Sequence, residues 1–208
     1  MKRINFETGT VTGNILNAAL PMLVAQILSL LYNIVDRIYI GRIPEIGTAA
    51  LGAVGLCFPL IMIITACSNL FGSGGAPIFS INRGMGDDNK ANTILNTSFT
   101  MVCASAIFLM LIGIVFSKPL LVLFGASPNA LTYARPYLFG TPPAMVSTGM
   151  NPFINAQGYS TTGMFSVTIG AVANIILDPL FIFVFGLGVN GAAIATVISQ
   201  ILSAVFVF

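Results

Sequence analysis

An aspartate stands inside one of the apolar runs of the chain, in the stretch ANIILDPLFIF (Ala173–Phe183). A loop at Asp178 and Pro179 would leave only Met164–Leu177 before it, which is too short for a bilayer core that needs about 20 apolar residues. Asp178 is therefore predicted to lie inside the membrane, where ionisable residues are rare and face a partner or a wet cavity. A carboxylate in that position can bind a proton or a small cation.

Two neighbours add oxygen atoms to the same place. Asn174 precedes Asp178 by one helical turn, so the two side chains share a helix face. Pro179 has no N–H to donate to the carbonyl oxygen of Ile175, and it favours a kink, as prolines in other membrane helices also do. The sequence thus predicts that side-chain and backbone oxygens converge near Asp178.

A second carboxyl group is a candidate partner for the first. Asp36 follows the uncharged run Ile15–Val35 and precedes Arg37, but apolar residues resume at Ile38–Ile40. The pattern fits an aspartate inside the first helix and one at the membrane surface equally well. If Asp36 and Asp178 share one pocket, burial and mutual repulsion oppose ionisation of both, so the pair would accept a proton at ordinary pH. The same hard oxygen atoms suit Na⁺ as well.

The composition is that of a polytopic membrane protein. Of 208 residues, 56% are hydrophobic and 7% are charged, against about 25% charged in soluble domains. The net charge of +2 is too small to indicate nucleic-acid binding. Histidine is absent and the three cysteines form no CxxC pair, which leaves no zinc motif and no Ser–His or Cys–His catalytic pair. We therefore expect a secondary active transporter with no catalytic residues, no cofactor, and no metal other than a transported Na⁺.

The uncharged runs predict an all-α bundle of six transmembrane helices, because helices satisfy their own backbone groups in lipid. The expected spans are residues 14–41, 48–72, 91–117, 134–157, 161–185 and 190–208, which together form one transmembrane lobe over residues 1–208. The glycine-rich stretch GSGGAP (Gly72–Pro77) lacks the ending of a phosphate-binding loop, and we expect it to mark close helix packing or a helix end. The last run ends in VFVF without a polar anchor, which we interpret as a truncated chain.

Charge does not decide the orientation of this bundle. An even number of spans between them places the amino terminus and the polar loop NRGMGDDNKAN on one side of the membrane. The basic residues are then balanced, with Lys2, Arg3, Arg83 and Lys90 on that side and Arg37, Arg42, Lys118 and Arg135 on the other. The positive-inside rule therefore favours neither side.

Four segments resemble one family of transporters. They are LPMLVAQILSLLYNIVDRIYIG (Leu20–Gly41), GMGDDNKA (Gly84–Ala91), NAQG (Asn155–Gly158) and, most specific, ANIILDPLFIFVFGLGVNGAAIATVISQ (Ala173–Gln200). These segments are similar to the multidrug and toxic compound extrusion (MATE) transporters, which have twelve helices in two six-helix lobes around a drug cavity. The resemblance covers essentially the whole chain but only the N-terminal lobe of that architecture.

The resemblance implies roles for individual residues. A subgroup of the family forms a proton or sodium site in its first lobe from residues that match Asp36, Asn174, Asp178 and Thr196. Pro21 matches a first-helix proline proposed to bend when that site is protonated, and Pro179 is the second helix-bending candidate. Tyr32 and Asn151 match positions near the substrate cavity. The resemblance also implies a multi-pass protein of the inner (cytoplasmic) membrane with its amino terminus in the cytoplasm.

The expected function is an antiporter, coupled to H⁺ or Na⁺, that exports amphipathic organic cations. Its expected partners are those cations, the lipid bilayer and the missing C-terminal lobe, and no nucleic acid. One alternative is a lipid-linked oligosaccharide flippase of the same superfamily, which would need a basic cavity for pyrophosphate, whereas the spans contain almost no lysine or arginine. The other is a non-transporting membrane subunit, which would show no ion or dye uptake in liposomes. The substrate and the choice between H⁺ and Na⁺ remain open.

Overall fold

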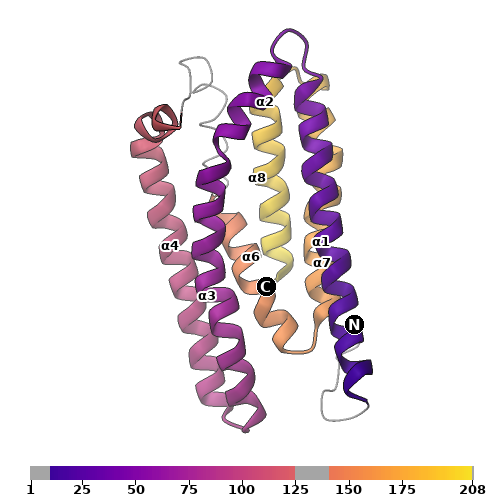
Figure 1. Cartoon of the computed structure of the whole chain (residues 1–208), viewed down its shortest axis with the longest axis vertical. Coiled ribbons are helices and arrows are strands. Elements are labelled where there is room, and N and C mark those ends of the chain that lie inside the picture. Colours follow the sequence, from indigo (N-terminus) through magenta and orange to yellow (C-terminus); the bar gives the residue numbers. More distant parts are fainter. Residues whose placement is uncertain (1–9, 125–140, 208) are drawn as a thin grey trace.

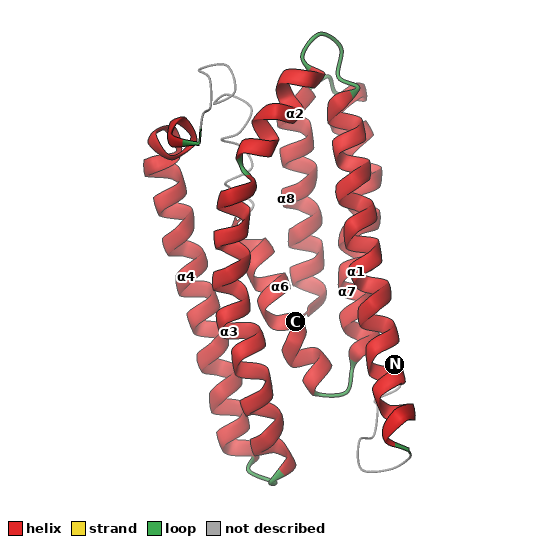
Figure 2. Cartoon of the chain, viewed as in Figure 1, coloured by secondary structure: helices red, strands yellow, loops and turns green. Residues whose placement is uncertain are grey.

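The computed structural model describes residues 10–124 and 141–207, and every regular element in these ranges is helical (Figures 1 and 2). The predicted all-α class is confirmed. The elements are α1 (Val11–Gly41), α2 (Gly47–Leu56), α3 (Phe58–Gly84), α4 (Asp88–Leu123), α6 (Thr141–Ala156), α7 (Ser160–Pro179), the π-helix η2 (Leu180–Val184) and α8 (Gly188–Val207).

Five helical segments are long and apolar enough to cross a membrane. They are Val11–Gly41, Gly47–Gly84, Asp88–Phe116, Ser160–Val184 and Gly188–Phe206. The fourth predicted span corresponds to α6, which has 16 residues, and its expected start at residue 134 lies outside the described residues. The prediction of a multi-pass helical bundle is therefore confirmed.

The second predicted span ends too early. We expected it to stop near residue 72, but α3 continues through the glycine-rich stretch to Gly84. The glycines serve helix packing: a β-carbon on Gly72 would collide with the backbone oxygen of Gly149 in α6, and one on Gly75 would lie 2.8 Å from Cζ of Phe153. Small residues of this kind let membrane helices approach closely. The packing interpretation of the motif is thus confirmed, and the helix end is wrong.

The helices alternate in direction through the bundle (Figure 1). The start of α1, the α3–α4 turn and the α6–α7 turn lie at one end of the molecule, and the α1–α2 turn and the η2–α8 turn lie at the other. Helix α7 packs against both α1 and α8, while α3 packs against α4 and α6. This arrangement brings the middle and late parts of α1 beside α7, which is the pairing that the predicted ion site requires.

A small apolar core holds the end of the bundle near that site. Its buried residues come from α1, the α1–α2 turn, α2, η2 and α8, and they are Ile40, Ile43, Ala50, Ile182, Val189 and Ala192. The turn into α8 uses Gly186 and Gly188 with φ of 65° and 55°, a left-handed backbone region in which glycine carries no steric penalty. Pro179 marks the change from α-helix to the π-helix η2. π-Helical segments are rare and occur frequently at functional sites.

Candidate ion site and adjoining pocket

Asp178 lies in the interior of the bundle and is held by a neighbouring amide. Its side chain is 0% exposed and that of Asn174 is 2% exposed. Asn174 Nδ2 donates to Asp178 Oδ1 at 3.2 Å and to Thr196 Oγ1 at 3.4 Å. The Thr196 hydroxyl donates in turn to the backbone oxygen of Ala192 at 2.9 Å. One amide group therefore links α7 to α8 and orients both oxygen partners.

The structure brings Asp36 to the same place. Asp36 lies within α1, five residues before its end at Gly41, and its carboxyl group is within hydrogen-bonding reach of Asp178. A hydrogen bond between two carboxyl groups requires that one of them carries a proton. The neighbouring Arg37 is exposed. The structure therefore places Asp36 inside the first helix and beside Asp178.

Three buried oxygens of this group have free acceptor capacity. Asp36 Oδ1, Asn174 Oδ1 and Asp178 Oδ2 accept no hydrogen bond from any described N–H or O–H donor. A buried acceptor without a partner costs free energy, so such atoms in native proteins call for an unseen partner or a functional role. The carboxylate and amide oxygen atoms from α1 and α7 can together bind a proton or coordinate a hard cation.

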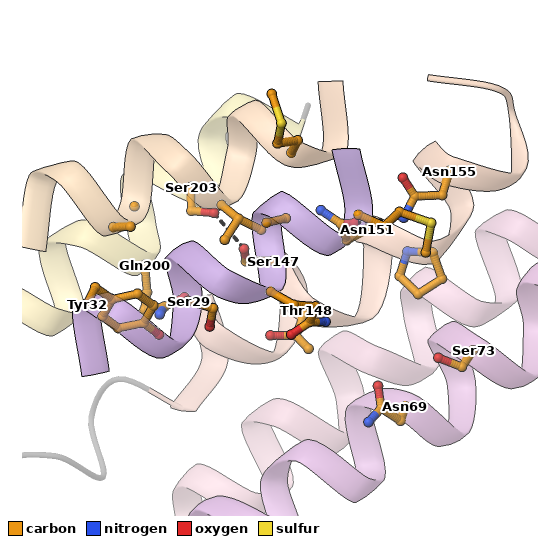
Figure 3. Close-up of a pocket in the computed structure, with 18 residues that line it drawn as sticks. Ser29, Tyr32, Asn69, Ser73, Ser147, Thr148, Asn151, Asn155, Gln200 and Ser203 are labelled. Carbon is orange, nitrogen blue, oxygen red and sulfur yellow. Dashed lines mark hydrogen bonds between the residues drawn. The ribbon is translucent and has the colours of Figure 1, made fainter. Parts of the chain in front are cut away.

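A polar pocket with a volume of about 350 Å³ lies between α1, α3, α6, α7 and α8 (Figure 3). Tyr32 and Asn151, the two cavity residues predicted from the sequence, both line it. No described residue that lines it carries a charge. Its polar side chains are those of Gln26, Ser29, Tyr32, Asn69, Ser73, Ser147, Thr148, Asn151, Asn155, Gln200 and Ser203.

The pocket and the carboxyl pair lie next to each other along the axes of the same helices. Tyr32 precedes Asp36 by four residues on α1, and Gln200 follows Thr196 by four residues on α8, a separation of about 6 Å along each helix axis. In Figure 3, Gln200 lies near Tyr32 and Ser29. Sequence reasoning missed Gln200, although its spacing from Thr196 places both on one face of α8.

Asparagine and serine side chains fix the walls of the pocket. Asn151 Nδ2 donates to the backbone oxygen of Gly163 at 3.0 Å, and Asn155 Nδ2 donates to Asn151 Oδ1 at 3.0 Å. The hydroxyls of Ser147 in α6 and Ser203 in α8 are 2.7 Å apart (Figure 3). These contacts tie α6 to α7 and α8, so the pocket is built on helices that are joined to one another.

A bundle of membrane-crossing helices with a pair of interior carboxyl groups beside a polar pocket is the arrangement of a secondary transporter. The family model named MatE matches residues 21–180, and the chain belongs to this family of multidrug and toxic compound extrusion transporters. The predicted family and the prediction of a transporter in place of an enzyme are both confirmed.

Curated relatives and solved structures agree with this assignment. The chain is 29% identical to the multidrug export protein MepA of Staphylococcus aureus over 205 residues, which are 97% of this chain and 45% of the relative. It resembles a crystal structure of MATE in complex with MaD5, with TM-score 0.89 and 26% identity over 100% of this chain and 47% of the other. It also resembles a MOP superfamily transporter from Pyrococcus furiosus, with TM-score 0.84 and 27% identity over 93% and 43%. The chain spans about half the length of the curated relatives it matches.

Proposed function

We propose that this chain is the N-terminal lobe of a cation-coupled antiporter that exports amphipathic organic cations. The observation that carries the proposal is the pair formed by half-buried Asp36 and fully buried Asp178, which lies one helical turn from an uncharged polar pocket. Relatives that are multidrug export proteins support it. In this proposal the pair binds the coupling ion, H⁺ or Na⁺, with Asn174 and Thr196, and the pocket forms part of the substrate cavity.

Helix α1 is the element that couples the two sites. It carries Asp36 of the ion site and the pocket residues from Met22 to Tyr32. Pro21 stands just before these residues and cannot donate a backbone hydrogen bond to Asn17, so α1 is weakest at that point. A bend at Pro21 that accompanies ion binding would move the pocket wall and Asp36 together, which makes the occupancy of one site depend on the other.

The proposed assembly includes a second lobe in the lipid bilayer of the cytoplasmic membrane, with the amino terminus in the cytoplasm. Apolar side chains on α1, such as Leu23, Ile27 and Leu30, are exposed and suit contact with lipid or with that lobe. The flippase alternative requires basic groups for pyrophosphate, and none occurs among the described residues that line the pocket. The uncharged lining therefore favours organic cations over a lipid-linked pyrophosphate.

Transport by the complete protein in proteoliposomes tests the proposal. Vesicles loaded with a fluorescent lipophilic cation should release it when an inward H⁺ or Na⁺ gradient is imposed, and the effective gradient identifies the ion. A non-transporting subunit would release no dye under either gradient. Release that is independent of both gradients would contradict ion coupling.

The amide that bridges α7 and α8 should contribute measurably to ion binding. Replacing Asn174 with alanine removes one candidate oxygen ligand and leaves Asp178 Oδ1 and Thr196 Oγ1 without their shared donor. We expect the coupling ion to bind about tenfold more weakly, which corresponds to a loss of about 1.4 kcal/mol. Ion titration of the purified protein measures this shift. An unchanged dissociation constant would show that Asn174 does not contribute to ion binding.

A further inference from the structure

The face of α7 that carries Asp178 continues toward the pocket. Asp178, Asn174, Gly170 and Ser166 follow one another at intervals of four residues, so they lie along one face of the helix. Asn174 and Ser166 are buried and hydrogen-bonded to α8. Gly170 stands between them without a side chain, so this row has one gap.

The side of α8 that faces this row of α7 carries three hydroxyl residues, Thr196, Ser199 and Ser203. Thr196 accepts a hydrogen bond from Asn174 at 3.4 Å, and the hydroxyl of Ser203 lies 3.0 Å from that of Ser166. Ser199 lies between these two contacts, three residues after Thr196 and four before Ser203. The two ends of the row are therefore hydrogen-bonded across the helix pair, and Ser199 occupies the middle.

Ser199 is the hydroxyl of this row with unused capacity. Its side chain is 2% exposed, and Ser199 Oγ has no hydrogen-bond partner among the described residues. A β-carbon on Gly170 would lie 3.4 Å from the backbone oxygen of Ser199 and 3.2 Å from Cβ of Ser203, so α7 approaches closely without placing a side chain there. Burial of an unpaired hydroxyl costs free energy, and a small polar ligand would satisfy it.

We propose that Ser199 is a relay site through which the coupling cation moves between the pocket and the Asp36–Asp178 pair. Ser203 lines the pocket and Thr196 contacts Asn174, so Ser199 lies on the polar route between the two sites. For H⁺, the Ser199 oxygen receives a proton from a water molecule on the pocket side and gives its own proton to a second water molecule on the side of the carboxyl pair. That water passes a proton to the carboxylate, and the Ser199 hydroxyl is left unchanged. For Na⁺, the same oxygen serves as a transient ligand. This inference rests on the proposed function.

The test compares the rate of ion uptake with the amount of ion bound in the complete protein as its gene encodes it. Purified protein in lipid nanodiscs is mixed rapidly with acid in the presence of a pH-indicator dye, and separately with radioactive sodium. Asp178→Asn shows which of the two ions binds at the carboxyl pair, because this substitution should abolish the uptake of that ion. The experiment with that ion is the arm used below. Ser199→Ala is then measured in that arm, with Ser68→Ala as the matched control.

Ser68 is a suitable control because it is also a buried serine but lies in α3, outside the row. Its hydroxyl donates to the backbone oxygen of Met145 at 2.9 Å, so Ser68→Ala should lower the thermal midpoint, whereas Ser199→Ala removes an unpaired hydroxyl and should not. We expect Ser199→Ala to bind the same amount of ion about tenfold more slowly. This is less than the hundredfold that a positioned proton-transfer group typically contributes, because Thr196 and Ser203 keep their hydroxyls in the same row.

Each outcome has one meaning. Slow uptake of an unchanged amount of ion in Ser199→Ala, with normal uptake in Ser68→Ala, supports the relay. Uptake in Ser199→Ala at the rate of Ser68→Ala, while Asp178→Asn abolishes it, overturns the relay and leaves the proposed function intact. Full uptake by Asp178→Asn in both arms overturns the proposed function itself.

Discussion

Replacement of Asp178 by asparagine is expected to abolish ion-driven efflux of an organic cation by the complete protein. Asparagine has nearly the same shape and still accepts a hydrogen bond from Asn174, but it neither takes up a proton nor attracts a cation at this site. Asp178 is fully buried, so a carboxylate on the surface of the protein cannot substitute for it at this position. We expect a loss of at least about 100-fold in the rate, equivalent to about 2.7 kcal/mol. Asp36→Asn should have the same effect, because the two carboxyl groups act on one ion.

A carboxylate of the α3–α4 side of the molecule provides the control for this experiment. Asp88 begins α4 and is exposed, and Asp88→Asn should leave efflux unchanged. The measurement is gradient-driven dye release from proteoliposomes that contain equal amounts of each variant. If Asp36→Asn and Asp178→Asn both retain ion-driven efflux, the pair is not the coupling site.

Replacement of Gly72 by alanine is expected to reduce the stability of the fold sharply. The new β-carbon would meet the backbone oxygen and carbonyl carbon of Gly149, and backbone atoms cannot rotate away as a side chain does. Helices α3 and α6 would have to separate, and overpacking of this kind costs about 1–3 kcal/mol or more. Thermal unfolding of the purified protein, followed by loss of the monodisperse species, measures the effect.

The same helix contains the matched control for this substitution. A β-carbon on Gly74 would meet nothing within 4 Å. Gly74→Ala should therefore stabilise the protein by about 0.5–1 kcal/mol, because alanine loses less backbone entropy than glycine in a helix. Opposite signs for two glycine-to-alanine changes two residues apart would confirm that Gly72 is a packing residue. Equal midpoints for the two variants would show that α3 and α6 are not in close contact at Gly72.

The arrangement of the candidate ion site was largely predictable because simple length arithmetic constrains a membrane helix. The run before Asp178 is too short to span without it, and the four-residue spacing places Asn174 on the same face. Asp36 was not predictable in the same way, because a charge near the end of an apolar run fits two depths in the membrane. Its position is decided by the packing of α1 against α7, which are far apart in the sequence.

The errors and omissions have a related physical cause. Glycine is common at helix ends and also at close helix contacts, so the run at Gly72 suggested an end where α3 continues. The π-helix after Pro179 has no sequence signal of its own. The serines of the pocket wall, Ser147 and Ser203, became recognisable only once α6 and α8 were seen side by side.

In the proposed antiporter, ion binding at the carboxyl pair and substrate binding in the pocket weaken each other, and one binding measurement tests this coupling. The dissociation constant of a fluorescent organic cation for the complete protein is measured with and without a saturating concentration of the coupling ion. Because linkage is reciprocal, the ion should weaken substrate binding by the same factor as substrate weakens ion binding, about 5- to 150-fold for a coupled pair of sites. The effect should disappear in Asp178→Asn. A substrate affinity that stays the same at every ion concentration would contradict the account.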